Sequence, residues 1–340
     1  MIDPHVHLRD WKQANKETLE HGLNVAIKAG LDGVFEMPNT NPSLTTNENI
    51  LKRLTQVDTL NLPIFHGIYG GLTAKQDQID EILETQRHLF PRVVGLKLYA
   101  GESTGTLSVE GTETQKNILA YLAEKKYQGL LALHCEEVSL FKAIYDVSNP
   151  ITHSFARPPE SEIRSIERIL DQAEALSFKG HLHFCHISVP EAVIMINNHK
   201  KRGKLRLSCG VTPHHVLADN SLMNKSDGYL WKMNPPLRAK EMQQLLFKML
   251  INGEIDWIET DHAPHLLTEK KQASGIPGFP IYPHLISILK NNALTEGDIN
   301  ILTHSNIEKA FQFNIKQYHR TPDMNLFHEY EYDPFADLNR

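Results

Sequence analysis

The sequence is poor in cysteine and has no long apolar run. Three cysteines occur among 340 residues, and Cys135, Cys185 and Cys209 form no CxxC pair, which favours a reducing compartment without structural disulfides. No stretch approaches the length of a membrane span. Asp3 and Arg9 lie where an export signal would need an apolar core. We therefore expect a cytoplasmic protein that makes no membrane contact.

The sequence also has no long run of acidic or of basic residues. The net charge is −6, with acidic and basic residues interspersed, so no basic stripe predicts nucleic acid as a partner. No glycine-rich phosphate fingerprint follows the first predicted strand, and no Pro-, Gly- or Ser-rich linker divides the chain. The hydrophobic content of 41% suffices for one ordinary core. We predict one main domain over residues 1–313, followed by a polar and aromatic tail over residues 314–340.

Strand-like and helix-like segments alternate along that domain. Besides the stretch around His5, strands are predicted over residues 33–37, 62–69, 93–99, 130–134, 181–187, 205–211 and 255–260. Helices are predicted over residues 16–29, 47–56, 75–89, 112–126, 136–145, 160–176, 191–201, 241–250, 283–289 and 299–311. Eight such units indicate an α/β protein with a (β/α)8 barrel, and an open doubly wound sheet is the alternative.

Histidine is abundant, with nineteen residues, and two of them lie close to the start of the sequence. His5 and His7 are two positions apart, so on a strand both imidazoles point to one face and can reach one metal ion. Arg9 continues the alternation and brings a fixed cation to the same face. This pattern predicts a metal centre that acts on an anionic substrate.

Further metal-type ligands fall where other strands end, the face on which barrels carry their active sites. They are Lys97, His134, His186 and Asp261. Each has an ordinary structural reading as well: an ion-paired lysine, core histidines or a helix cap. A buried neutral amine can instead add carbon dioxide to form a carbamate that bridges two cations. We expect strand alternation to point Cys135 and Cys185 away from the metals, and leave His214, His215 and His262 as supporting or structural residues.

Several stretches together resemble the dihydroorotases of the amidohydrolase superfamily. They occur in family order between residue 3 and about residue 312. The matching stretches are Asp3-Pro4-His5-Val6-His7-Leu8-Arg9-Asp10, Met37-Pro38-Asn39-Thr40, Gly95-Leu96-Lys97-Leu98-Tyr99, Lys232-Met233-Asn234-Pro235-Pro236-Leu237-Arg238 and Thr260-Asp261-His262-Ala263-Pro264-His265. The resemblance implies a distorted amidohydrolase barrel and the zinc-dependent, reversible cyclisation of N-carbamoyl-L-aspartate to L-dihydroorotate in pyrimidine biosynthesis.

The resemblance also implies roles for single residues. His5 and His7 with Asp261 would bind one Zn²⁺, His134 and His186 the other, and carboxylated Lys97 would bridge both. Asp261 would in addition be the catalytic base and acid. The residues implied for the substrate are Arg9, Asn39 and His265 on its carboxylate, Asn234, Pro277 and Gly278 around the ring or carboxylate side, and Thr104 on a closing loop.

One departure and two alternatives accompany this interpretation. Relatives with a β-sandwich beside the barrel build it from both termini, and we expect this chain to lack a full one. The alternatives are another cyclic amidohydrolase (hydantoinase, dihydropyrimidinase or allantoinase) and a catalytically inactive scaffold. The carboxylate clamp of Arg9, Asn39 and His265 favours dihydroorotate over the uncharged rings. The expected partners are a small-molecule substrate and, as an option, a second copy in a homodimer.

Overall fold

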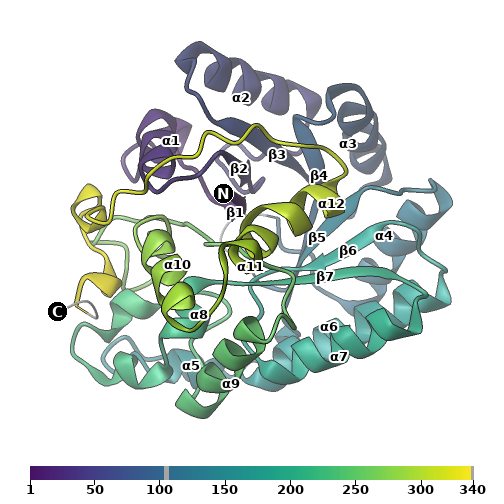
Figure 1. The fold of residues 1–340 in the computed structure, drawn as a ribbon. Helices are drawn as coiled ribbons and strands as arrows, with labels where there is room; N and C mark the ends of the chain where they lie inside the picture. Colours follow the sequence, from purple (N-terminus) through teal and green to yellow (C-terminus); the bar gives the residue numbers. More distant parts are fainter. Residues whose placement is uncertain (103–106, 338–340) are drawn as a thin grey trace.

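Eight parallel strands form a ring in which each strand pairs with the next one in sequence (Figure 1). The computed structural model describes residues 1–102 and 107–337. The strands are β1 (Ile2–Val6), β2 (Gly33–Glu36), β3 (Phe65–Gly71), β4 (Val93–Ala100), β5 (Leu130–Cys135), β6 (His181–Phe184), β7 (Arg206–Val211) and β8 (Trp257–Ile258). Beyond β8, Asp261 N–H donates to His5 O at 3.1 Å and His7 N–H to His262 O at 2.7 Å. These bonds join the last strand to the first and confirm the predicted (β/α)8 barrel.

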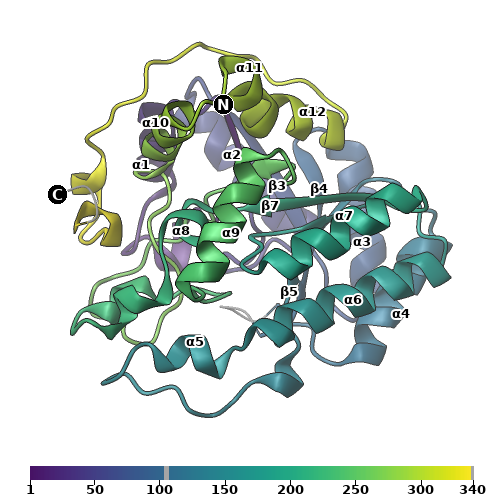
Figure 2. The same cartoon turned by 60° about the horizontal axis from the view of Figure 1, so that its bottom comes forward.

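Helices surround the ring on its outer face (Figures 1 and 2). The longer ones are α1 (Leu19–Lys28), α2 (Asn47–Leu60), α3 (Gln76–Leu89), α4 (Thr112–Glu124), α6 (Pro159–Ala175), α7 (Pro190–Arg202), α9 (Lys240–Ile251) and α10 (Tyr282–Asn291). Shorter ones are α5 (Thr152–Ala156), α8 (Pro213–Leu217), α11 (Glu296–Asn300) and α12 (Asn306–Phe311), the last two joined by a π-helical turn over Ile301–Ser305. No described helix has the length and apolar character needed to cross a membrane.

Most predicted helices agree with the structure, and helix ends follow local chemistry. Thr18 and Thr46 cap α1 and α2, because each hydroxyl accepts a backbone N–H from the first turn. The helix predicted over residues 136–145 is wrong: only a 3₁₀ turn, Val138–Leu140, forms there. Glu136 is instead held in the interior by hydrogen bonds with His134 and Arg157, so no α-helix begins directly after β5.

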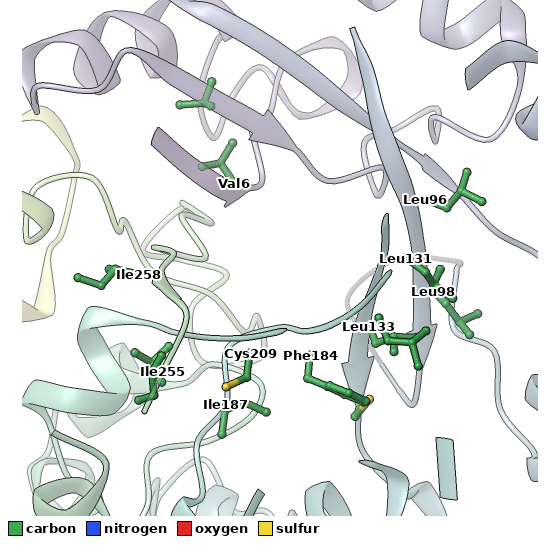
Figure 3. Packing of buried hydrophobic residues seen from close by; sticks show 14 of the residues in the cluster. Val6, Leu96, Leu98, Leu131, Leu133, Phe184, Ile187, Cys209, Ile255 and Ile258 are labelled. Atoms are coloured by element: carbon green, nitrogen blue, oxygen red, sulfur yellow. The ribbon is translucent and has the colours of Figure 1, made fainter. Parts of the chain in front are cut away.

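The core has two layers. Outward-facing strand residues pack in one large cluster with residues of the helices. Figure 3 labels four of them on β4 and β5, Leu96, Leu98, Leu131 and Leu133, where Leu96 pairs with Leu131 and Leu98 with Leu133. Inward-facing residues near the strands form a second, smaller cluster with residues of α12 and of the segment after it. The first group contains Ile2, Phe35, Met37, Tyr69, Val94, Leu130, Ala132, Cys185 and Trp257, and the second Ile307, Ala310, Phe311 and Ile315. Burial from both sides explains why the strands read as nearly continuous apolar runs.

The segment after α12 lies against the barrel as far as it is described. It runs past the N-terminal ends of the first strands toward α1, as the yellow ribbon shows in Figures 1 and 2. Tyr318 N–H donates to Asp32 Oδ1 at 2.9 Å, and Asp323 N–H to Lys28 O at 2.8 Å. Tyr332 then reaches the opposite rim, where its hydroxyl donates to Gly275 O at 3.3 Å. The domain boundary near residue 313 stays a prediction.

Candidate active site

His5, His7 and Asp261 meet at the carboxyl ends of β1 and β8. The pairing of β1 with β2 shifts register between Asp3 and Val6, and both His5 and His7 are buried. His7 Nε2 lies 2.9 Å and His5 Nε2 3.3 Å from Asp261 Oδ1. The three side chains offer ligand atoms within 4.8 Å of one another and are all buried. The structure thus brings together three of the predicted metal ligands.

Asp261 and His7 have the protonation states that ligands of a metal ion need. Burial opposes ionisation of Asp261, but His7 and His5, whose Nε2 atoms lie 2.9 Å and 3.3 Å from Oδ1, hold the pKa of its carboxyl well below its usual value. His7 Nδ1–H donates to Asn39 Oδ1 at 2.6 Å, because an amide oxygen can only accept. This bond leaves the lone pair of His7 on Nε2, the nitrogen that faces the site. A partner that fixes the tautomer in this way is typical of metal-ligating histidines.

His134 and His186 form a second pair next to the first. His134 Nδ1 lies 3.1 Å from His186 Nε2, and the rings of His186 and His5 are 5.0 Å apart. His134 Nε2–H donates to Glu136 Oε2 at 3.0 Å, which leaves the lone pair of His134 on the nitrogen that faces His186. Two imidazole nitrogens on one tetrahedral Zn²⁺ lie roughly 3.3 Å apart, from Zn–N bonds of about 2.0–2.1 Å. The pair therefore has the spacing of two ligands.

Lys97 is fully buried in β4 and points into the barrel, but its neighbour there was not expected. Its Nζ lies 3.2 Å from Cys185 Sγ, and Cys185 also groups with His5 and Glu259. The prediction that Cys185 points away from the metals is therefore wrong. His186 adopts a left-handed backbone with φ of 39°, so the alternation of β6 ends there and both Cys185 and His186 face inward.

Glu259 connects these groups and was missed by the sequence interpretation. Its buried carboxylate accepts His186 N–H at 2.5 Å, His183 Nε2–H at 2.9 Å and Trp257 Nε1–H at 3.2 Å. It also lies 3.6 Å from His5 Nδ1. An acidic residue two positions before Asp261 in a strand predicted to be buried was the available signal.

The donors present fit one or two metal ions. In the described part of the chain, the buried nitrogens His5 Nδ1 and His186 Nδ1 have no hydrogen-bond partner. Two imidazole pairs and an ionised carboxylate converge, and imidazole and carboxylate are ligands that zinc and its neighbours accept. A lysine amine is a poor ligand while it is protonated, whereas its carbamate would be an anion at the same place. The residues therefore suit a metal centre.

Arg9 and His265 stand beside this centre on the side of the β8 loop. Arg9 Nε–H donates to Pro264 O at 3.1 Å, and Nη2 lies 3.2 Å from His265 Nε2. The backbone of Arg9 is held in turn by buried Arg53, which donates to Arg9 O at 2.7 Å and pairs with Glu36. A guanidinium with a fixed backbone is suited to a forked pair with a carboxylate.

A small cavity opens beside Arg9 and the group of His5, His7 and Asp261. Its lining consists of His5, His7, Arg9, Asn39, Tyr99, His186, Asn234, Asp261, Ala263, Ser274 and Gly275. Asn234, whose contact with a substrate stays a prediction, is one of these lining residues, and its amide oxygen lies 3.1 Å from His153 Nε2. The lining uses Ser274 and Gly275 rather than Pro277 and Gly278, and the Gly278 N–H donates to His262 Nδ1 at 3.0 Å. Thr104 lies outside the described residues.

Charged residues also connect the centre to the loop after β4. Arg157 donates to both oxygens of Glu136, whose other partner is His134, and to Glu102 O at 2.8 Å. Burial opposes ionisation of Glu136, but Arg157 and His134 hold its pKa well below its usual value. This arrangement orients His134, and only the folded chain reveals it because its members come from three segments.

The barrel and these convergent donors define a metal-dependent amidohydrolase, and comparisons with known proteins agree. The chain is 30% identical over 325 residues to a dihydroorotase of Methanosphaera stadtmanae, covering 92% of this chain and 70% of that protein. It is 31% identical to one from Methanosarcina mazei (92% and 70%) and 33% identical to one from Brevibacillus brevis (82% and 63%). The chain belongs to the dihydroorotase family. It spans 63–70% of the length of these three relatives.

Solved structures show the same fold. A dihydropyrimidinase from Brevibacillus agri superposes with a TM-score of 0.78 at 19% identity, covering 98% of this chain and 79% of that one. An L-hydantoinase from Arthrobacter aurescens gives 0.76 at 21% (92% and 70%), and a dihydroorotase from Campylobacter jejuni 0.68 at 16% (93% and 84%). No family model matches the chain.

Proposed function

We propose that this chain interconverts N-carbamoyl-L-aspartate and L-dihydroorotate, a step of pyrimidine synthesis. The observation that carries the proposal is that Arg9, which contacts His265, lines the same cavity as His5, His7 and Asp261. Metal ligands alone suit any cyclic amide. A buried cation at the same cavity suits a ring that bears a carboxylate.

We propose two Zn²⁺ as the metals. His5, His7 and Asp261 would hold one, His134 and His186 the other, and carboxylated Lys97 would lie between them. Bound there, the ions would lower the pKa of water toward neutrality and polarise the ring carbonyl. The fit rests on the approach of His5 Nε2 and His7 Nε2 to Asp261 Oδ1 and on the 3.1 Å between His134 Nδ1 and His186 Nε2. It also rests on the hydrogen bonds that keep the lone pairs of His7 and His134 directed inward.

The residues of the chain would bind the substrate and move its protons. Arg9 would grip the substrate carboxylate in a forked pair, with His265 and Asn39 beside it. In the hydrolytic direction, a water oxygen bonds to the ring carbonyl carbon and the C–N bond breaks. Asp261 would accept the proton that the water releases and deliver it to the departing nitrogen, as one base and acid. The reverse sequence closes the ring and releases water.

A substrate panel tests the proposal. We expect the metal-loaded protein to hydrolyse L-dihydroorotate, measured by ultraviolet absorbance, and to act far less on dihydrouracil, hydantoin and allantoin. A preference for an uncharged ring would assign the chain to another cyclic amidohydrolase. Inertness toward all four by the fully metallated protein would favour the scaffold alternative. The expected cytoplasmic location and homodimer are separate predictions, for cell fractionation and light scattering.

Arg9→Met tests the clamp itself. Removing the guanidinium should lower kcat/KM for dihydroorotate by about 10²-fold, since a charge-assisted bond contributes roughly 1.5–3 kcal/mol. Activity toward dihydrouracil should change little. Arg87→Met is the matched control, because the Arg87 side chain is 68% exposed on α3. Equal losses on both substrates would remove Arg9 from this role.

A further inference from the structure

His265 lies between two cations, one at each ring nitrogen. Arg9 Nη2 is 3.2 Å from His265 Nε2, and Lys16 Nζ is 3.3 Å from His265 Nδ1. Nε2 also lies 3.1 Å from the backbone oxygen of Ser274. The His265 ring is almost fully buried, with a side-chain exposure of 1%. These contacts place three hydrogen-bonding groups around a ring that has two nitrogens.

The ring is neutral in this setting. Burial, then Arg9 and Lys16, hold the pKa of His265 far below its usual value. A neutral imidazole has one N–H donor and one lone pair, so the two cations cannot both donate to it. Only one of them can have His265 as its acceptor.

The backbone oxygen of Ser274 decides which nitrogen carries the hydrogen. A carbonyl oxygen can only accept, so its contact with Nε2 places the hydrogen there. Nδ1 then holds the lone pair and accepts from Lys16. The opposite tautomer would direct Nδ1–H at the Lys16 ammonium, and the carboxylate oxygen Glu269 Oε2 lies 3.6 Å from Nδ1, beyond hydrogen-bond distance. Two satisfied contacts favour the first tautomer over the second.

The consequence concerns Arg9. With a hydrogen on Nε2 that Ser274 O accepts, His265 is no acceptor for Arg9 Nη2 and does not compete for the hydrogens that Arg9 carries beside the cavity it lines. The carboxylate of a substrate in this cavity supplies the acceptor instead. We propose that Lys16 is a positioning residue that fixes the Nε2–H tautomer of His265, so that Arg9 keeps its Nη2 hydrogens for a substrate carboxylate. This inference rests on the proposed dihydroorotase activity.

A simpler role for Lys16 predicts different results. Lys16 Nζ also pairs with Glu269 Oε2 at 2.9 Å, and an ion pair that only holds the loop would give the lysine a structural role. The Lys16 side chain is 16% exposed and that of Glu269 is 37% exposed, so both can be changed without opening the core. Glu269→Gln removes the ion pair and keeps the donor to His265. Lys16→Met removes both.

Ring-nitrogen NMR reads the tautomer without any turnover. In protein labelled with ¹⁵N at the histidine rings, and with His265→Gln to assign the signals, wild-type His265 should show a protonated Nε2 and an unprotonated Nδ1. Lys16→Met should shift His265 toward the other tautomer, and Glu269→Gln should leave it unchanged. An Nδ1–H tautomer in the wild type, or no change in Lys16→Met, would overturn the inference.

Kinetics of the metal-loaded protein supply the second readout. Lys16→Met should raise KM for dihydroorotate roughly tenfold, with kcat within about threefold, and should leave dihydrouracil turnover unchanged. Lys16→Arg should recover most of the loss. Lys12→Met, an exposed lysine four positions earlier, is the matched control. If Glu269→Gln raises KM as much as Lys16→Met does, the role of Lys16 is only to hold the loop through its ion pair with Glu269. Wild type that fails on dihydroorotate would refute the proposed function, and the NMR result would still decide the tautomer.

Discussion

Replacing Glu259 by Gln perturbs the residue on which the metal side of the site depends. The carboxylate accepts three N–H groups, from His186, His183 and Trp257, in the fully buried interior of the barrel. The glutamine amide has nearly the same shape but offers one oxygen and one NH₂. Wherever the NH₂ is placed, it faces at least one N–H donor.

The magnitude follows from these contacts. Each hydrogen bond to a charged group contributes roughly 1.5–3 kcal/mol, and leaving a buried donor without an acceptor costs about 1–3 kcal/mol. Because the amide oxygen introduced by Glu259→Gln would still accept some of these N–H groups, we expect a loss of about 3 kcal/mol in the free energy of unfolding. Residues that orient metal ligands typically change metal affinity by about 10–100-fold. The two metal ions, one held in part by His5 and the other by His186, should therefore bind that much more weakly.

Two assays measure the two parts of this effect. Urea unfolding of the chelator-treated protein gives the structural loss, and competition with a zinc indicator gives the affinity. Glu113→Gln is the control, because the Glu113 side chain is 73% exposed at the start of α4. Unchanged metal affinity in Glu259→Gln, in protein that remains folded, would refute the assignment of Glu259 as the residue that orients the ligands.

Three further predictions follow from the contacts. Arg53→Met should raise KM for dihydroorotate, because it removes the hydrogen bond that holds the Arg9 backbone. It should also destabilise the fold by about 3–5 kcal/mol, because buried Glu36 loses its guanidinium partner. Arg53→Lys should restore neither KM nor stability. Burial raises the pKa of Asp333 to about 8, so the folded state holds this proton more tightly than the unfolded state, and stability should fall from about pH 4 to pH 8. Asp333→Asn should remove that loss and gain about 1–3 kcal/mol at pH 8 by urea unfolding, whereas an unchanged pH profile would contradict the assignment. Chelation should abolish turnover, and Zn²⁺ should restore both turnover and stability; retained activity in demonstrably metal-free protein would oppose a metal-dependent reaction.

The fold could be derived from the sequence because its signal is repeated eight times. Apolar strands that end in polar residues predicted both the barrel and the rim on which His5, His7, Arg9 and Asp261 lie. Alternation along each strand was sufficient for that step, since parallel strands present their carboxyl ends at one rim.

The rest of the site depends on features that strand alternation does not encode. Cys185 follows the alternation of His183 and Phe184 and faces inward, whereas His186, with its left-handed backbone, leaves that alternation and faces inward as well. Glu136 left the predicted helix because Arg157, far along the chain, holds it in the interior. Glu259 receives N–H groups from two strands and the loop after β6, so its role appears only when they are brought together.

A crystal structure with anomalous scattering at the zinc edge tests the central claim most directly. We predict two peaks about 3.5–4 Å apart, one among His5, His7 and Asp261 and one at His134 and His186. Continuous density should extend from Lys97 Nζ between them, as a carbamate requires. A metallated crystal with zinc bound elsewhere, or with a bare Lys97 amine still beside Cys185, would contradict the proposed centre.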